Sequence, residues 1–303
     1  MLVNSTFGMF IRGEGNPRFF MMIIILTVIS NIVLDYMFIG WFGLGMGGAA
    51  LASLLSLLIG ALCMVGFFLR KSHVYKLGKF AFSQDVLRDT LLNGSSEFIG
   101  QMSMSISMFA CNWVIMRIVG VAGLAAFTII GYVAYVFNMV IIGFGQGASP
   151  LISFAYGAQD LELSKTVRKK TNLFAFLAGV VFVMVMLMAA DWYSAIFVSN
   201  EHVETMIRSG MGIFMISFLF SGVNVITSFY FTSIGKAKES ALISSARGLV
   251  VLLICIFTLP SWLGMTGVWL VAPVTEVLTI VLSFMLICRH ENAAGTILES
   301  HDS

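Results

Sequence analysis

Residues 19–41 read FFMMIIILTVISNIVLDYMFIGW, an apolar run in which Asp35 is the one charged residue. About 20 apolar residues, each adding 1.5 Å, span the ~30 Å hydrocarbon core of a bilayer, so the run predicts a transmembrane helix. Asp35 falls about 24 Å into this helix, and Asn31 lies one turn earlier on the same face. Because a carboxylate in a membrane costs about 2.5–3.5 kcal/mol on insertion scales, the pair is a candidate functional site. A structural hydrogen bond between the two is the alternative.

The composition of the whole chain is that of a membrane protein. Hydrophobic residues make up 59% of the 303 residues and charged residues 11%, whereas soluble domains carry about 25% charged residues. A net charge of +2 gives no reason to expect nucleic-acid binding. The four cysteines lie in apolar runs without disulfide or metal-site spacing, so we expect small buried side chains.

Seven further runs of this kind predict an all-α integral membrane protein with about eight transmembrane helices. The eight runs are Phe19–Trp41, Leu44–Leu69, Phe98–Val119, Val121–Phe144, Asn172–Ala190, Met211–Ile234, Ala241–Leu259 and Val268–Ile287. If they alternate in direction, fifteen of the 17 basic residues fall on one side, the exceptions being Arg117 and Arg208. The positive-inside rule then predicts a multi-pass membrane protein with a cytoplasmic C-terminus.

Two short motifs recur near the ends of the chain. Leu44-Gly45-Met46-Gly47-Gly48 returns as Leu263-Gly264-Met265-Thr266-Gly267, and Gly15-Asn16-Pro17-Arg18 resembles Gly235-Lys236-Ala237-Lys238. This offset of 219–220 residues predicts parallel repeats, with a substrate path between them. The first repeat would then lack about 126 residues, so an in-frame extension before Met1 is expected. Asn31 and Asp35 fall opposite apolar residues in the second copy, so the shared architecture does not require them.

Other polar side chains within the predicted spans are candidates for a substrate cavity. They are Glu97, Gln101, Asn112, Tyr132, Asn138 and Glu276. Glu97 and Gln101 share one face of the third span with Ser105, although a helix start also favours a negative charge such as Glu97. Glu276 lies midway along the last span, where a functional or pairing role is expected. No nucleotide-binding, zinc-protease or serine-hydrolase motif occurs, so neither an enzyme nor a cofactor is expected.

Several motifs together resemble the multidrug and toxic compound extrusion (MATE) transporters. Arg12-Gly13-Glu14-Gly15-Asn16-Pro17 resembles the loop before the family's fifth helix, Asn31-x-x-x-Asp35 its Asn/Asp pair, and Gly48-Ala49-Ala50-Leu51-Ala52-Ser53 the start of its sixth helix. Asn112 and the segment from Gly120 to Ala126 resemble the loop joining the seventh and eighth helices. Gly143-Phe144-Gly145-Gln146-Gly147-x-x-Pro150 and Tyr156-Gly157-Ala158 resemble the eighth-helix signature. The order is that of the family, and the prokaryotic branch with MepA-like and DinF-like exporters is the most similar.

The resemblance implies the last two helices of an N-lobe and a complete six-helix C-lobe of a twelve-helix fold. Residues 1–71 would end the N-lobe, 72–93 would be a cytoplasmic amphipathic linker, 94–290 the C-lobe and 291–303 a polar tail. It also implies a monomeric antiporter of the bacterial inner membrane, which exports small organic, drug-like or cationic compounds in exchange for Na⁺ or H⁺. By motif position, Asn31, Asp35 and Ser53 would belong to the cation site, whose first-helix aspartate would lie in the missing segment. A flippase for lipid-linked sugars and an inactive truncated remnant are the alternatives.

Overall fold

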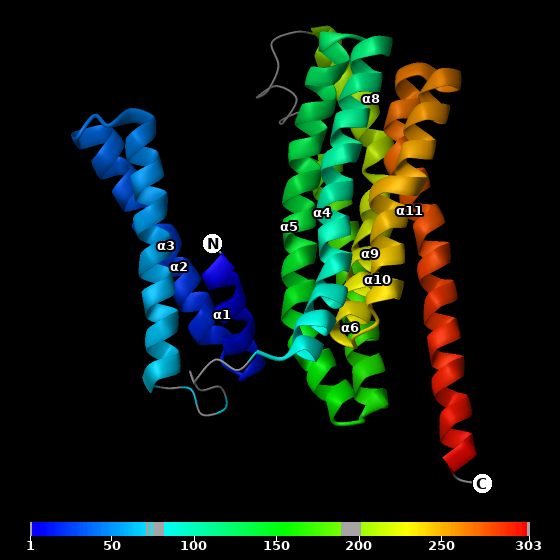
Figure 1. Cartoon of the computed structure of the whole chain (residues 1–303). Helices are drawn as coiled ribbons and strands as arrows, with labels where there is room; N and C mark the ends of the chain where they lie inside the picture. Colours follow the sequence, from blue (N-terminus) through cyan, green and yellow to red (C-terminus); the bar gives the residue numbers. More distant parts are fainter. Residues whose placement is uncertain (1, 71, 73, 75–81, 189–200, 302–303) are drawn as a thin grey trace. The chain divides into compact units, whose positions relative to one another are not determined.

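A computed structural model describes residues 2–70, 72, 74, 82–188 and 201–301, and every regular element within these ranges is a helix. The chain divides into two compact units, Met1–Ser83 and Gln84–Ser303, called here the N-terminal and C-terminal units. Figure 1 shows the helices of each unit packed side by side along their lengths. The fold class predicted from the sequence, an all-α membrane protein, is confirmed.

The N-terminal unit consists of α1 (Leu2–Gly13), α2 (Pro17–Asp35), a π-helical turn η1 (Tyr36–Trp41) and α3 (Gly45–Arg70). Its core gathers phenylalanine and aliphatic side chains at the end near the α1–α2 turn, where Ile11, Ile23, Met64, Phe67 and Phe68 are buried. Gly60 of α3 makes the close approach possible, because a Cβ there would lie 2.7 Å from Thr27 Oγ1 of α2. Small residues at helix contacts are typical of bundles in lipid.

The C-terminal unit packs around a central helix. Its elements are α4 (Gln84–Ile118), α5 (Val121–Gly157), α6 (Leu161–Met188), α8 (Glu201–Phe214), α9 (Ile216–Ser233), α10 (Ala237–Ser245), a π-helical turn η2 (Ala246–Val250) and α11 (Val251–His301). The central helix α9 contacts α5, α6, α10 and α11. Three phenylalanines, Phe137, Phe182 and Phe218, interlock where α5, α6 and α9 meet, with ring centroids 4.7–5.3 Å apart.

The described helices include seven that are long and apolar enough to cross a membrane. The last of them runs from Ala237 to Glu291 but is interrupted at Gly264, whose φ of 57° and ψ of −134° are not helical. Its two arms contain the last two predicted spans, Ala241–Leu259 and Val268–Ile287. The eight predicted runs therefore fall in seven helices, because the last helix holds two runs, one on each side of its break at Gly264.

Several helices extend beyond the apolar runs that predict them, although α9, at Ile216–Ser233, is shorter than its run, Met211–Ile234. In the segment expected to link the lobes, residues 84–93 are helical and continue into α4, while 73 and 75–81 lie outside the described residues. Similarly, α11 extends to His301, well into the expected polar tail. Hydropathy locates the hydrocarbon-crossing part of a helix, but backbone hydrogen bonds continue past the membrane surface wherever no breaker residue intervenes.

Glycines of positive φ occur at corresponding positions of the two repeated motifs, and the first motif has an additional one, Gly43 at 64°, where the last has Trp262. Gly15 and Gly235 both have positive φ, at 85° and 74°, and Gly45 and Gly264 have φ of 53° and 57°. Such values are costly for residues with a Cβ, which explains a glycine at each position. The segments that follow, Pro17–Arg70 and Ala237–Glu291, are called here the first and last hairpins.

The hydrogen bonds that close the entry turns of the two hairpins also correspond. Asn16 N donates to Ile11 O at 3.1 Å, and its counterpart Lys236 N donates to Phe231 O at 2.8 Å. Each bond ends the preceding helix before a new helix begins one residue later, at Pro17 or Ala237. The agreement in conformation supports the duplication inferred from sequence.

Candidate functional site

The Asn31–Asp35 pair lies at the end of α2, just before the η1 turn. Asn31 Nδ2 and Asp35 Oδ1 are both shielded from solvent, and neither has a hydrogen-bond partner among the residues that the structure describes. The hydroxyl of Thr27, one turn before Asn31, instead donates to Ile23 O at 2.8 Å. The alternative, a hydrogen bond between these two side-chain atoms, is therefore not formed. π-helical turns within longer helices often occur at functional sites, which fits the position of this pair.

Ser53 does not join the pair in the described N-terminal unit. Its residue is exposed on α3, and its carbonyl accepts a hydrogen bond from Ser56 Oγ at 3.0 Å. Asn31 and Asp35 thus share one helix face, and within the described residues no hydrogen bond links Ser53 to them. The role of Ser53 in a cation site stays a prediction.

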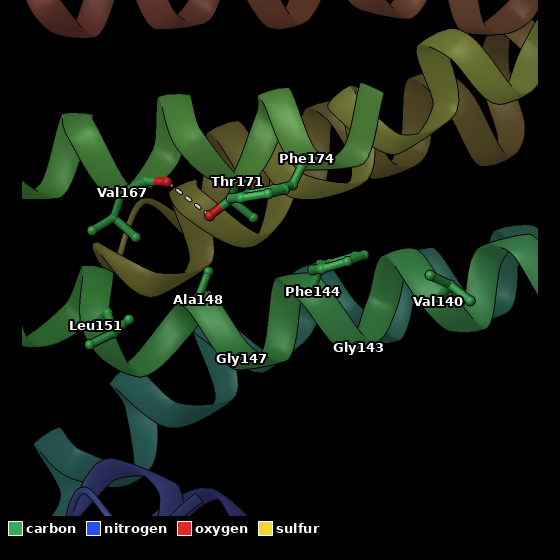
Figure 2. A pocket seen from close by; sticks show the side chains of 9 residues that line it. All are labelled: Val140, Gly143, Phe144, Gly147, Ala148, Leu151, Val167, Thr171 and Phe174. Carbon is green, nitrogen blue, oxygen red and sulfur yellow. Dashed lines mark hydrogen bonds between the residues drawn. The ribbon is translucent and has the colours of Figure 1, made fainter. Parts of the chain in front are cut away.

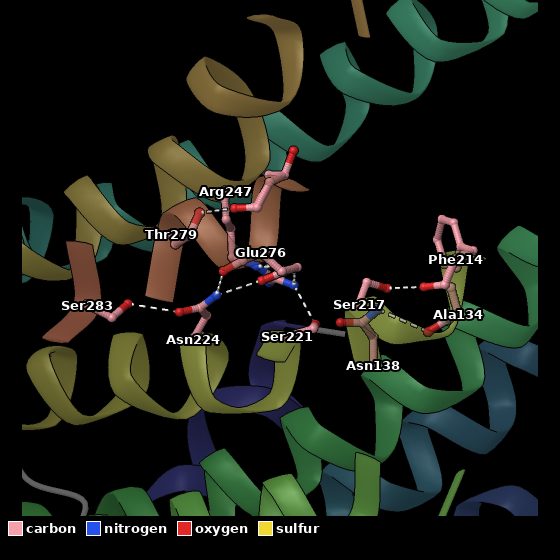
Figure 3. A network of polar contacts seen from close by, with 11 residues as sticks. Ala134, Asn138, Phe214, Ser217, Ser221, Asn224, Arg247, Glu276, Thr279 and Ser283 are labelled. Atoms are coloured by element: carbon pink, nitrogen blue, oxygen red, sulfur yellow. Dashed lines mark hydrogen bonds and ion pairs between the residues drawn. The ribbon is translucent and has the colours of Figure 1, made fainter. Parts of the chain in front are cut away.

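Glu276 lies in a buried network of the C-terminal unit (Figure 3). Arg247 of η2 donates to Glu276 Oε1 through Nη2 at 2.8 Å and through Nε at 3.1 Å. Asn224 of α9 donates to Glu276 Oε2 at 2.7 Å and to the Glu276 carbonyl at 3.0 Å. Both carboxylate oxygens therefore have internal partners, and the pairing role expected for Glu276 is filled by Arg247.

The network continues beyond the ion pair. Arg247 Nη2 also donates to Ser221 Oγ at 2.9 Å, and Ser283 Oγ donates to Asn224 Oδ1 at 3.0 Å. It therefore ties α9, η2 and α11 together. A buried pair is tolerated when its remaining donors and acceptors are satisfied in this way, and removing one partner leaves an uncompensated charge. The assignment of Glu276 to a substrate cavity stays a prediction.

The polar residues of α4 divide between two faces of that helix. Ser103 and Ser107 are buried, and Ser107 Oγ donates to the carbonyl of Gly248 in η2. A Cβ at Gly248 would lie 3.0 Å from Ser103 Cβ, so the two helices are in close contact there. Gln101 and Ser105 are exposed on another face. The side chain of Glu97 lies outside the described residues.

No hydrogen bond among the described residues links the remaining predicted cavity residues to one another. Asn112 is half-buried on α4, and Tyr132 on α5 is 65% exposed. Asn138 is half-buried, and its Nδ2 donates to Ala134 O at 3.0 Å, near Ser217 in Figure 3. Their grouping in a substrate cavity stays a prediction.

The glycine signature of α5 serves two faces of the helix. Gly145 is buried against Phe229 of α9, where a Cβ would overlap the aromatic ring. Gly143 and Gly147 point instead into a groove between α5 and α6. The signature residues Gln146 and Pro150 are half-buried, and Gly157 ends the helix. The signature thus combines a tight helix contact with an open surface.

Arg247 and Asn224 were missed by the sequence reasoning. The charge bias places Arg247 on the cytoplasmic side, but it lies ten residues into the helix that begins at Ala237, about 15 Å along its axis. It is therefore the half-buried ion-pair partner of the buried Glu276, and fourteen of the 17 basic residues carry the orientation argument. Asn224, an amide in the middle of an apolar run, is a signal that could have pointed to a partner for Glu276.

The chain is similar in sequence and in fold to known membrane transporters. The profile of the MatE family matches residues 98–257, just over half of the chain, from α4 into α11. The chain belongs to the MatE family. The relatives of this MatE chain include "Multidrug export protein MepA" of Staphylococcus saprophyticus, 22% identical over 266 residues, which cover 86% of this chain and 57% of the relative. The human "Multidrug and toxin extrusion protein 1" is 25% identical and is matched over 79% of this chain and 42% of its own length.

Solved MATE structures share the fold of this MatE chain. An outward-facing MATE family transporter of the MOP superfamily superposes with a TM-score of 0.90 at 25% identity, covering 97% of this chain and 66% of that one. The chain thus spans a little over half of the curated bacterial relatives it matches. It is a multi-pass membrane protein of a transporter family.

Proposed function

We propose that this MatE chain forms part of a cation-coupled exporter of small organic, drug-like or cationic compounds, with Asn31 and Asp35 as cation-binding residues. The relatives named as multidrug export and extrusion proteins support the export activity. The observation that carries the cation site is the buried Asp35 Oδ1 in an apolar helix, for which the described part of the chain offers no hydrogen-bond partner. The coupling ion is Na⁺ or H⁺.

The chemistry of Asp35 differs from that of Glu276. Glu276 already has Arg247 as a counter-charge, whereas Asp35 is left with an open oxygen. In hydrocarbon such a carboxylate is stabilised either by a proton or by a bound cation, so its charge can change during a transport cycle. Rotation of the Asn31 amide by 180° presents its oxygen where Nδ2 now lies, which would add a second hard oxygen ligand.

A transport assay tests this proposal. The gene is expressed with any in-frame sequence upstream of Met1, and efflux of a fluorescent organic cation is followed from loaded cells. We expect Asp35→Asn to abolish efflux, because the amide can neither take up a proton nor neutralise a cation. Glu162→Gln is the matched control, since Glu162 is exposed and pairs with Lys165 of its own helix at 3.1 Å. Unchanged efflux in Asp35→Asn would remove Asp35 from the coupling site.

A binding assay separates the ion site from transport. Thermal unfolding of the purified chain is measured in NaCl and in choline chloride of equal ionic strength, at pH 6 and pH 8. We expect Na⁺ or the lower pH to raise the unfolding midpoint of the wild-type chain, and neither to raise that of Asp35→Asn. If the unfolding midpoint of the wild-type chain changes neither with Na⁺ nor with pH, the result argues against a cation site in this chain.

A further inference from the structure

An apolar groove of about 570 Å³ lies between α5 and α6 of the C-terminal unit (Figure 2). Its lining residues are Val140, Gly143, Phe144, Gly147, Ala148, Leu151, Val167, Thr171 and Phe174. The hydroxyl of Thr171 donates to Val167 O at 2.8 Å, so its donor is already used within α6. Phe144 and Phe174 face each other with parallel rings, their centroids 6.5 Å apart. The groove thus offers apolar contacts to whatever fills it.

The two glycines of the groove leave its α5 side open. A Cβ at Gly143 or at Gly147 would meet no atom within 4 Å, apart from its own helix and chain neighbours, whereas one at Gly145 would overlap Phe229. Leu151 and Phe174, at either end of the groove, are about 60% exposed. The groove is therefore open toward the surroundings of the unit rather than filled by its core.

A cationic side chain stands at the edge of this groove. On α6, Val167, Thr171 and Phe174 face the groove, and Lys170 follows Val167 by three residues, which places it about 60° around the helix on the same side. Lys169 points about 160° away from Val167. Both lysines are exposed. Because helical side chains lean toward the helix N-terminus, the long Lys170 chain reaches toward the α5–α6 turn.

The α5–α6 turn marks the water end of the groove, because Asp160, Glu162 and Lys165 cluster there. From Leu151 near this end to Val140, the groove follows eleven residues of α5, about 16 Å of helix. One leaflet of a ~30 Å hydrocarbon core is about 15 Å deep. An apolar groove as long as one leaflet, beside a lysine whose side chain extends toward the water end, fits one acyl chain and an anionic headgroup.

We propose that the groove between α5 and α6 binds an acyl chain of an anionic phospholipid, whose phosphate pairs with Lys170. The acyl chain lies over Gly143 and Gly147, beside Phe144 and Phe174. This site is separate from Asn31 and Asp35, which belong to the other unit, and it does not depend on the proposed export activity. Basic residues at the mouth of grooves between membrane helices favour anionic over zwitterionic headgroups.

The headgroup arm of the test uses a pair of lysine variants. The purified chain in detergent is titrated with phosphatidylglycerol or phosphatidylcholine of the same acyl chains, and the thermal unfolding midpoint is recorded. We expect phosphatidylglycerol to raise the midpoint more than phosphatidylcholine. Lys170→Gln should weaken apparent phosphatidylglycerol affinity about fivefold, as expected for one basic side chain near an anionic headgroup, while Lys169→Gln retains most of it. Equal shifts with both lipids, or equal losses in both variants, would overturn the proposal.

The acyl-chain arm uses a pair of glycine variants and a soluble headgroup. Gly147→Leu fills the groove and should abolish the lipid-specific shift. Gly131→Leu on the same helix is the control, because a Cβ there also meets nothing within 4 Å and Gly131 does not line the groove. Glycerol 3-phosphate should give no shift; a shift equal to that of the lipid would indicate a phosphate site without an acyl chain and overturn the proposal. If Gly147→Leu fails to fold, the lysine pair still decides the outcome.

Discussion

The first and last hairpins share their backbone turns but carry different polar groups. Both begin after a glycine of positive φ and both turn at a second one, Gly45 or Gly264. In the first hairpin, Asp35 is left with an unpartnered oxygen, whereas in the last hairpin Glu276 is held by Arg247 and Asn224. The turns therefore define the common fold of the two hairpins. The polar side chains distinguish them, because the carboxylate of Asp35 can change its charge whereas that of Glu276 is held in an ion pair.

The largest expected effect comes from removing the counter-charge in the last hairpin. Arg247→Met leaves Glu276 buried without its cation, and loss of one partner of a buried pair costs about 3–5 kcal/mol. Chemical unfolding of the purified chain in mixed micelles measures this change. The double variant Arg247→Met with Glu276→Leu should recover most of the loss, because no buried charge remains. If Arg247→Met alone is as stable as the wild type, the ion pair is solvated rather than buried.

A smaller effect is expected at the shared turn. Ala at Gly45 or at Gly264 must adopt a positive φ, a strained conformation that costs about 1–3 kcal/mol. Both substitutions should lower the unfolding free energy by similar amounts if the hairpins are structural copies. Gly47→Ala and Gly66→Ala are controls, because a Cβ at either meets nothing within 4 Å and neither has positive φ. A cost at only one of the two turns would break the equivalence between the hairpins.

Much of this comparison could be predicted from sequence, since both turns depend on local residue identity. A glycine that recurs at a fixed offset between apolar runs is enough to indicate a shared backbone conformation. The partner of Glu276 could not be found in this way. Arg247 sits in a segment with Lys236, Lys238 and Glu239 nearby, so its charge is indistinguishable in sequence from a solvated one. Only the packing of η2 against α4, together with the hydrogen bonds from Arg247 to Ser221 of α9 and Glu276 of α11, turns it inward.

The π-helical turns also escaped prediction. A π turn adds one residue to a helical turn without changing the hydropathy pattern, so neither η1 after Asp35 nor η2 at Arg247 has a periodicity signal. The sequence predicts only in part which face of α4 is buried. Alternating serines at 103, 105 and 107 allow several helix orientations, and contact with Gly248 selects the one that buries Ser103 and Ser107.

The contact between α4 and η2 predicts an intermediate effect. Ser107→Ala removes the hydrogen bond to Gly248 O and leaves a buried carbonyl without that donor, which costs about 0.5–1.5 kcal/mol. Ser105→Ala is the matched control, because Ser105 is exposed on another face of α4 and its hydroxyl donates to Gln101 O within the same helix. Unfolding free energies of the two variants, measured side by side, check the difference. Equal values would mean that the bond does not anchor η2.

The smallest effect on stability is expected at the residue with the largest proposed effect on transport. Asp35→Asn removes no hydrogen bond from Oδ1, because that atom has none, and it relieves the desolvation of a charge. The unfolding free energy without a coupling ion should therefore change by less than about 1 kcal/mol, with no loss of stability. Denaturation in choline chloride at pH 8 measures it. A destabilisation like that of Arg247→Met would mean that Asp35 has a structural partner, and the contrast between the two hairpins would no longer hold.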